Sequence, residues 1–130
     1  MRIKLTSIFV DDQAKALKFY TEVLGFAKKT EIPMGEVSWL TVVSVDDTEG
    51  TELSLEPNSN PAAATFQQTL FEQGIPLTAF EVDDLAAEFK RLVDQGVEFK
   101  QEPTDAGPVS MAVLNDTCGN LIQIYQIKSG

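Results

Sequence analysis

The sequence predicts an α+β protein made of two tandem βαβββ modules that form a cup-shaped mixed sheet with the helices outside. The main observation is an internal repeat: residues 3–12 (IKLTSIFVDD) and 75–84 (IPLTAFEVDD) are identical at six of ten positions. In both halves this segment leads into a helical pattern that ends at a glycine followed by a large apolar residue. Such a match at one offset is typical of a duplicated structural unit.

The first half contains the signals of one strand, one helix and three further strands. Residues 3–10 alternate between two faces and predict a strand. Asp12 predicts the N-cap of a helix that continues to Leu24, and Gly25 predicts its C-terminal cap. Strands are expected at about 26–32, 37–45 and 51–56, because turn-forming residues lie at 34–35 and 46–50.

The second half repeats this order after a connecting helix. Asn60 and Pro61 predict the N-cap and first position of a helix that ends near Gln73. A strand at 75–82, a helix at 85–95 and strands at 97–101, 108–114 and 121–127 follow. We therefore expect one domain over 1–130, with module 1 at about 1–57, the connector helix at about 60–74 and module 2 at about 75–128.

Charge and cysteine content limit the possible partners and compartment. The net charge of −10 repels phosphate groups, so we expect neither nucleic acid nor a membrane as partner. The same negative charge either attracts a cationic ligand or serves solubility alone. The first ten residues are too short and too charged for a signal peptide or membrane span. The single cysteine cannot form an internal disulfide, which favours a cytoplasmic protein.

Two segments resemble a known family. The helix segment VDDQAKALKFYTEVLGF (10–26) and the last strand CGNLIQIYQ (118–126), set in two βαβββ modules, resemble the vicinal oxygen chelate superfamily. That group includes glyoxalase I, bleomycin-resistance proteins, fosfomycin-resistance transferases and extradiol dioxygenases. The resemblance covers nearly the whole chain. It implies a homodimer with ligand-binding cups and, in the enzymes, a divalent metal held by four strand residues.

The resemblance also implies where a metal would be held, and this chain lacks suitable donors there. It contains no histidine, leucine has no donor atom, and glutamine offers only a weak neutral oxygen. We therefore expect no metal, no other cofactor, and no metal-dependent glyoxalase or dioxygenase activity. The four implied positions are Leu5, Leu77, Ser54 (with Glu52 or Glu56 as alternatives on the same strand face) and Gln123.

Strand alternation predicts which side chains line the cup. Glu52, Ser54 and Glu56 share one face, where the carboxylates either receive a cation, act as a general base, or face solvent. Aromatic residues on the strands either stack on a planar ligand or pack in the core. The expected ligand-binding residues are Leu5, Ser7, Phe9, Trp39, Ser54, Leu77, Ala79, Gln123 and Tyr125, which together form an apolar cleft with a few polar groups.

These observations favour a metal-free small-molecule-binding protein of the bleomycin-resistance type, which sequesters a planar or cationic compound. One alternative is a metal-independent lyase, isomerase or transferase that uses Glu52 or Glu56 as base. Another is a non-catalytic dimeric scaffold. Cys118 is expected to be a structural residue of a hairpin turn. Whether the modules pair within one chain or exchange between chains stays open.

Overall fold

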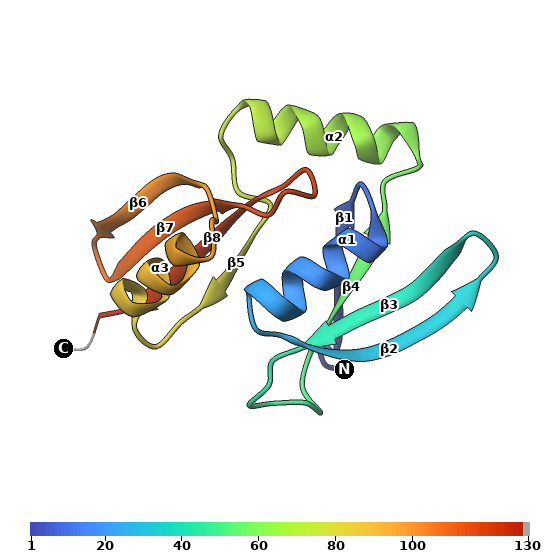
Figure 1. The fold of residues 1–130 in the computed structure, drawn as a ribbon, viewed down its shortest axis with the longest axis horizontal. Helices are drawn as coiled ribbons and strands as arrows, with labels where there is room; N and C mark the ends of the chain where they lie inside the picture. Colours follow the sequence, from blue (N-terminus) through green and yellow to red (C-terminus); the bar gives the residue numbers. More distant parts are fainter. Residues whose placement is uncertain (129–130) are drawn as a thin grey trace. The chain divides into compact units, whose positions relative to one another are not determined.

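The computed structural model describes residues 1–128 and divides the chain into two compact units, residues 1–65 and the part from Phe66 onward. Each unit contains one four-stranded mixed sheet in which one strand pair is parallel and the others are antiparallel. Each sheet is accompanied by its own helix (Figure 1). The predicted α+β fold with two tandem βαβββ modules is therefore confirmed.

The first unit follows the expected order of elements. Its strands are β1 (Leu5–Val10), β2 (Ala27–Met34), β3 (Val37–Val43) and β4 (Glu52–Pro57), and they are arranged in the sheet as β1-β4-β3-β2. β1 is parallel to β4, while β3 is antiparallel to both of its neighbours. β3 ends at residue 43 rather than at the predicted residue 45.

The helix of the first unit is not the continuous α-helix that was predicted. It consists of α1 (Gln13–Lys18) followed by a π-helical turn, η1 (Phe19–Val23), in which the Leu24 N–H donates to the Phe19 carbonyl at 3.0 Å. The Thr21 hydroxyl donates to the Leu17 carbonyl at 2.7 Å and so competes with the backbone ladder at this point. π-Helical turns of this kind are local interruptions of α-helices, and periodicity does not reveal them.

The second unit repeats the arrangement. Its strands lie in the order β5-β8-β7-β6, with β5 parallel to β8. The helix caps repeat as well: Asp12 and Asp84 accept backbone N–H groups at 3.0 and 3.1 Å, and Gly25 and Gly96 both have positive φ. The elements from the connector onward are α2 (Pro61–Glu72), β5 (Thr78–Glu81), α3 (Leu85–Asp94), β6 (Phe99–Ala106), β7 (Val109–Asn115) and β8 (Leu121–Ile127).

Two strand boundaries of the second unit differ from the prediction. β5 begins at Thr78 instead of residue 75, so Leu77 precedes the strand, although its N–H still donates to the Leu121 carbonyl at 2.8 Å. Pro76 has no N–H to offer the ladder. β6 begins at Phe99 and continues to Ala106, five residues beyond the expected end, with register shifts on either side of Gln101.

The core of each unit lies between its sheet and its helix. In the first unit α1 packs on β3 and β4, and in the second α3 packs on β6, β7 and β8. Among the described residues no helix is long and apolar enough to cross a membrane. The buried apolar side chains include Ile8, Val10, Ala16, Tyr20, Leu40, Val42, Leu53 and Leu55 in the first unit and Leu85, Leu92, Ala112, Leu114, Ile122 and Ile124 in the second.

Candidate ligand-binding faces

Strand register determines which predicted site residues of the first unit share a surface. Ser7 pairs with Ser54 and Phe9 with Glu56 across β1 and β4, and Thr41 of β3 pairs with Ser54. Paired residues point to the same side of a sheet, and alternate residues along a strand do so too. The resulting surface, here called the module 1 face, carries Leu5, Ser7, Phe9, Trp39, Thr41, Glu52, Ser54 and Glu56.

The module 1 face is the one turned away from the core. Residues of the opposite parity, such as Val42 and Leu55, are fully buried beneath the helix. Trp39 is 47% exposed and Leu5 is 48% exposed, so neither belongs to the core. The register thus places Trp39 on the side of the sheet opposite Val42 and Leu55 and leaves it half exposed.

Both carboxylates of the module 1 face are held by hydroxyl groups. Glu52 Oε1 accepts a hydrogen bond from Thr41 Oγ1 at 2.7 Å and a longer one from Thr30 Oγ1 at 3.4 Å. Glu56 Oε1 accepts from Ser54 Oγ at 2.9 Å. Over residues 1–128 no lysine or arginine pairs with Glu52 or Glu56. The face thus carries oriented carboxylate oxygens whose charge no side chain of the described part neutralises.

Thr30 and Thr41 were not among the predicted site residues. Thr41 is fully buried and lies two residues beyond Trp39 on the same side of β3. That alternation was available in the sequence, but the partner of each hydroxyl depends on the pairing of β2, β3 and β4. Pairing of strands separated by loops cannot be obtained from alternation alone.

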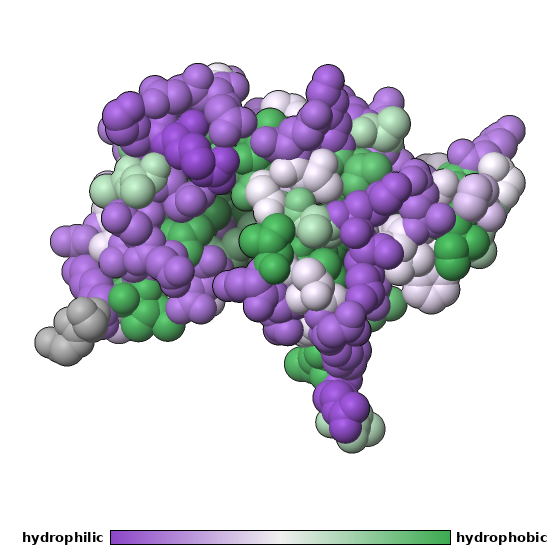
Figure 2. Space-filling model, turned by 60° about the horizontal axis from the view of Figure 1, so that its bottom comes forward, coloured by the Kyte–Doolittle hydropathy of each residue, from purple (hydrophilic) through white to green (hydrophobic). Residues whose placement is uncertain are grey.

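Exposed apolar side chains continue the module 1 face along the β2–β3 hairpin. Ile32 is paired with Trp39, and Met34 with Val37, on the side that carries Thr30 and Thr41. All four are exposed, by 39% to 59%. Exposed hydrophobic patches, green in Figure 2, interrupt a largely hydrophilic surface. Contiguous apolar surface of this kind marks interaction sites in soluble proteins.

The second unit has an equivalent surface, here called the module 2 face. Ala79 pairs with Gln123, and Glu81 with Tyr125, across β5 and β8. Gln123 and Tyr125 are half-buried, while Ala79 and Glu81 are exposed. Three of the predicted residues, Ala79, Gln123 and Tyr125, are therefore brought together on this face. Leu77 lies before β5 and is half-buried, and Glu81 is an addition that the prediction missed.

The donor set at the metal positions implied by the family does not fit a transition metal. Leu5 and Leu77 have no donor atom, and Ser54 and Gln123 offer only neutral oxygens. Within the described part of the chain no three histidine, cysteine, aspartate or glutamate side chains come together as a metal site would require.

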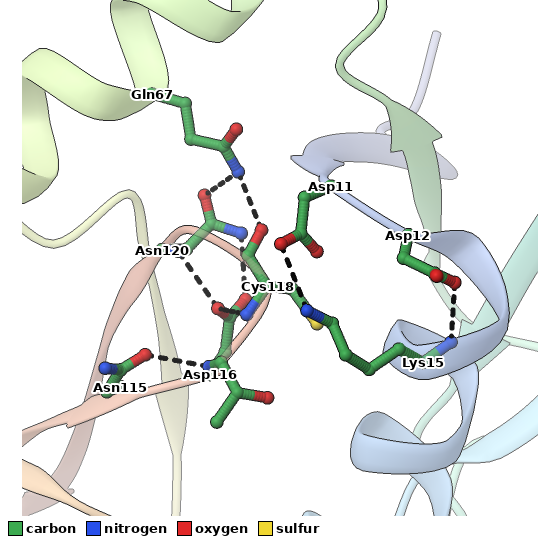
Figure 3. A network of polar contacts seen from close by, with 9 residues as sticks. Asp11, Asp12, Lys15, Gln67, Asn115, Asp116, Cys118 and Asn120 are labelled. Carbon is green, nitrogen blue, oxygen red and sulfur yellow. Dashed lines mark hydrogen bonds and ion pairs between the residues drawn. The ribbon is translucent and has the colours of Figure 1, made fainter.

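Cys118 occupies the turn between β7 and β8, where the sequence placed it, and it is fully buried. Its backbone N–H donates to Asp116 Oδ1 at 2.7 Å, and the same oxygen accepts from the Asn120 N–H at 2.9 Å. Gln67 of α2 donates to the Cys118 carbonyl and to Asn120 Oδ1 (Figure 3). Buried polar groups of this turn are thus paired with one another, as a structural role requires.

A separate groove of about 390 Å³ lies near the start of α1, and none of the predicted ligand residues lines it. Two of its carboxylates are already engaged: Asp12 caps the helix, and Glu31 pairs with Lys28 at 2.9 Å. Its lining is Asp12, Gln13, Ala14, Leu17, Glu31, Glu36, Val37, Ser38, Leu40 and Pro57.

Comparison with known proteins agrees with the two-module fold. The chain belongs to the Glyoxalase/Bleomycin resistance protein/Dioxygenase superfamily, whose family model matches residues 2–124. It is 56% identical to the protein YurT of Bacillus subtilis (strain 168) over 126 residues, which covers 97% of this chain and 99% of that protein. It is 29% identical over 134 residues to a lactoylglutathione lyase of Neisseria meningitidis, covering 100% of this chain and 94% of the enzyme.

Solved structures of similar proteins share the fold over nearly their whole length. The structure of UcmS2 has a TM-score of 0.83 and 32% identity and covers 96% of this chain and 97% of its own. TnmS3, an antibiotic binding protein from Streptomyces sp. CB03234, has a TM-score of 0.78 and 27% identity and covers 98% and 97%. The superfamily thus includes a similar protein whose described role is binding.

Proposed function

We propose that this protein binds and sequesters a small molecule in the cytoplasm, without a metal or other cofactor, through its module 1 and module 2 faces. The observation that carries the proposal is the composition of the module 1 face. Exposed Leu5 and Trp39 share this face with Glu52, whose oxygen is oriented by the Thr41 hydroxyl. Apolar side chains combined with fixed polar groups are the usual composition of a small-molecule site.

The same composition favours a planar or cationic ligand. An aromatic ring supplies area for stacking, and burial of apolar surface contributes roughly 25 cal/mol per Å². The negative charge of Glu52 and Glu56 attracts cations and repels anions. The antibiotic-binding function of TnmS3 supports the assignment to a binding protein.

A metal-independent enzyme is the second candidate. It is favoured by the similarity to a lactoylglutathione lyase and by the position of Glu52 and Glu56 on the open face, where either carboxylate would act as base. In this candidate the bound compound is converted, whereas a sequestering protein releases it unchanged. A non-catalytic dimeric scaffold would bind no small molecule at these faces.

We also propose that the protein is a homodimer. Each four-stranded sheet has two edge strands, β1 and β2 in the first unit and β5 and β6 in the second. Edge strands and exposed apolar side chains favour association with a second copy. The exposed side chains of Phe66 and Phe71 on α2 add to the apolar surface.

A thermal-shift and calorimetric screen of cationic and neutral aromatic compounds tests the binding function. Ligand binding stabilises the folded state by about 2.7 kcal/mol at one hundred times Kd, so a true ligand raises Tm in a saturable way and is recovered chemically unchanged. Glu52→Gln should weaken its binding, while Glu22→Gln, which removes an equal charge from an exposed position of η1, should not. Conversion of the compound would favour the enzyme, and a screen without any binder would contradict the proposal.

A further inference from the structure

Each unit carries one aromatic ring and one carboxylate at the same place in its sheet. In the first unit Phe9 of β1 is paired with Glu56 of β4. In the second unit Glu81 of β5 is paired with Tyr125 of β8. The internal repeat aligns position 9 with position 81, so the two pairs are equivalent, but ring and carboxylate have exchanged strands.

The register places ring and carboxylate side by side within each pair. Parallel neighbouring strands lie about 4.8 Å apart, and directly paired residues point to the same side of the sheet. Phe9, Glu56 and Tyr125 are half-buried and Glu81 is exposed. In each sheet the pair lies on the side opposite the helix, which carries Ser54 in the first unit and Gln123 in the second.

No ion pair within the described part of the protein neutralises the charge of these two carboxylates. Neither Glu56 nor Glu81 takes part in an ion pair within residues 1–128, although six other ion pairs occur there. Glu56 Oε1 is held by the Ser54 hydroxyl at 2.9 Å, which orients the carboxylate on the face. An oriented carboxylate beside a ring, with no internal cation, is complementary to an external one.

The chemistry of such a pair selects one kind of group. A protonated amine is attracted to the carboxylate by charge and hydrogen bonding and to the ring face by the cation–π interaction. Anions are repelled, and each pair offers a transition metal only one carboxylate, joined in the second unit by the phenol oxygen of Tyr125. In the second unit an alkyl or aryl body attached to the amine would contact the neighbouring apolar side chain of Met111, which is paired with Tyr125.

We propose that the Phe9–Glu56 and Glu81–Tyr125 pairs are two ammonium-binding subsites, and that the ligands of this protein are organic amines protonated at neutral pH. This inference rests on the proposed binding function and specifies its ligand class. Each subsite lies within one unit, so each recognises its ammonium group independently of the other.

Binding of 1-naphthylmethylamine, compared with its neutral analogue 1-naphthylmethanol, tests the proposal on the full chain. In ¹H–¹⁵N spectra at pH 7 the amine should shift the amide signals of residues 7–10 and 79–82. It should bind about 3- to 10-fold more tightly than the alcohol, as one charge-assisted hydrogen bond with a cation–π contact implies. Glu56→Gln should abolish this preference at residues 7–10 only, and Glu81→Gln at residues 79–82 only.

Two matched variants complete the test. Glu22→Gln should change neither set of signals, and Tyr125→Phe, which keeps the ring, should retain the preference that Tyr125→Ala reduces. Equal binding of amine and alcohol, absence of amine binding, or insensitivity to both Glu→Gln variants would overturn the inference. If the alcohol or another neutral compound still binds, the proposed binding function stands although the ammonium subsites are wrong.

Discussion

Gly119 lies so close to Gln67 that no side chain fits between them. A Cβ atom at position 119 would lie 2.7 Å from Gln67 Nε2, which donates hydrogen bonds to the Cys118 carbonyl at 3.1 Å and to Asn120 Oδ1 at 3.0 Å (Figure 3). Gly119 also has a φ of +103°, a conformation that residues with a Cβ rarely adopt. The glycine therefore allows α2 to be fixed to the β7–β8 turn.

Gly119→Ala should lower the free energy of unfolding by about 2 kcal/mol or more, because backbone strain is combined with loss of buried hydrogen bonds. Chemical denaturation measures this change. Gly25→Ala is the matched control, since Gly25 has a similar φ of +95° but has nothing within 4 Å of the added Cβ. If both variants lose the same stability, the contact with Gln67 contributes nothing beyond the strain.

Gln13 is expected to stabilise the point where β3 and β4 separate. These strands are paired only at Thr41–Ser54 and Val42–Leu53. The Gln13 amide donates to the Ser38 and Leu55 carbonyls, both at 2.8 Å, and accepts from the Ser38 N–H at 3.0 Å. Gln13→Ala should therefore cost about 1–3 kcal/mol in denaturation experiments.

The control for Gln13 is an exposed glutamine on another helix. Gln68 donates only to Glu72, one helical turn away, at 3.1 Å. Gln68→Ala should change the free energy of unfolding by less than about 0.5 kcal/mol. A Gln13→Ala protein as stable as the Gln68→Ala protein would show that the bridge between the strands is not needed.

Trp39 should report ligand binding directly, because it is the only tryptophan and is half exposed on the module 1 face. A bound ligand should change its fluorescence. Trp39→Ala should weaken binding by about 1–3 kcal/mol, with a smaller effect on stability, and Trp39→Phe should retain much of the affinity. Normal binding by a strongly destabilised Trp39→Ala protein would contradict the role given to this residue.

The pKa of Asp105 is held below its ordinary value, first by the Ser110 hydroxyl, which donates to Oδ1 at 2.7 Å, and then by Lys128 at 3.4 Å. A lowered pKa in the folded state contributes stability above the ordinary carboxyl pKa, and this contribution is lost as pH falls through the lowered pKa. Ser110→Ala should raise the pKa toward its ordinary value in a ¹³C carboxyl titration. An unchanged titration curve would exclude the hydroxyl as the main cause.

The proposed homodimer should have twice the mass of the 14.3 kDa chain in light scattering at micromolar concentration. Exposed apolar residues of the β2–β3 hairpin and α2 provide surface for association. Ile32→Ser and Phe66→Ser test these two regions separately, since each removes one exposed side chain. A monomer at this concentration in the unaltered protein would contradict the prediction and favour a self-contained chain.

Local sequence signals were sufficient for most of the fold. The aspartate caps at 12 and 84 and the glycines at 25 and 96 were visible as a repeat, and the structure shows the same hydrogen bonds and positive φ in both copies. Caps and strand alternation involve residues only a few positions apart, so their physical causes are contained in short segments. For the same reason alternation along β3 places Trp39 and Val42 on opposite sides of the sheet.

The exact ends of the helices and strands, and the hydrogen-bond partners of their side chains, depended on residues more distant in the sequence. The π-helical turn, the late start of β5 and the extension of β6 depend on which hydrogen-bonding groups compete for the same partners. The alternation of side chains along a strand does not reveal this competition. Thr41 and Glu52 face one another because β3 and β4 pair across an intervening loop, and Gln67 reaches Asn120 over 53 positions of sequence. The sequence therefore specified the modules and the polarity of their faces, whereas strand register and packing determined which carboxylate is oriented, and by which hydroxyl.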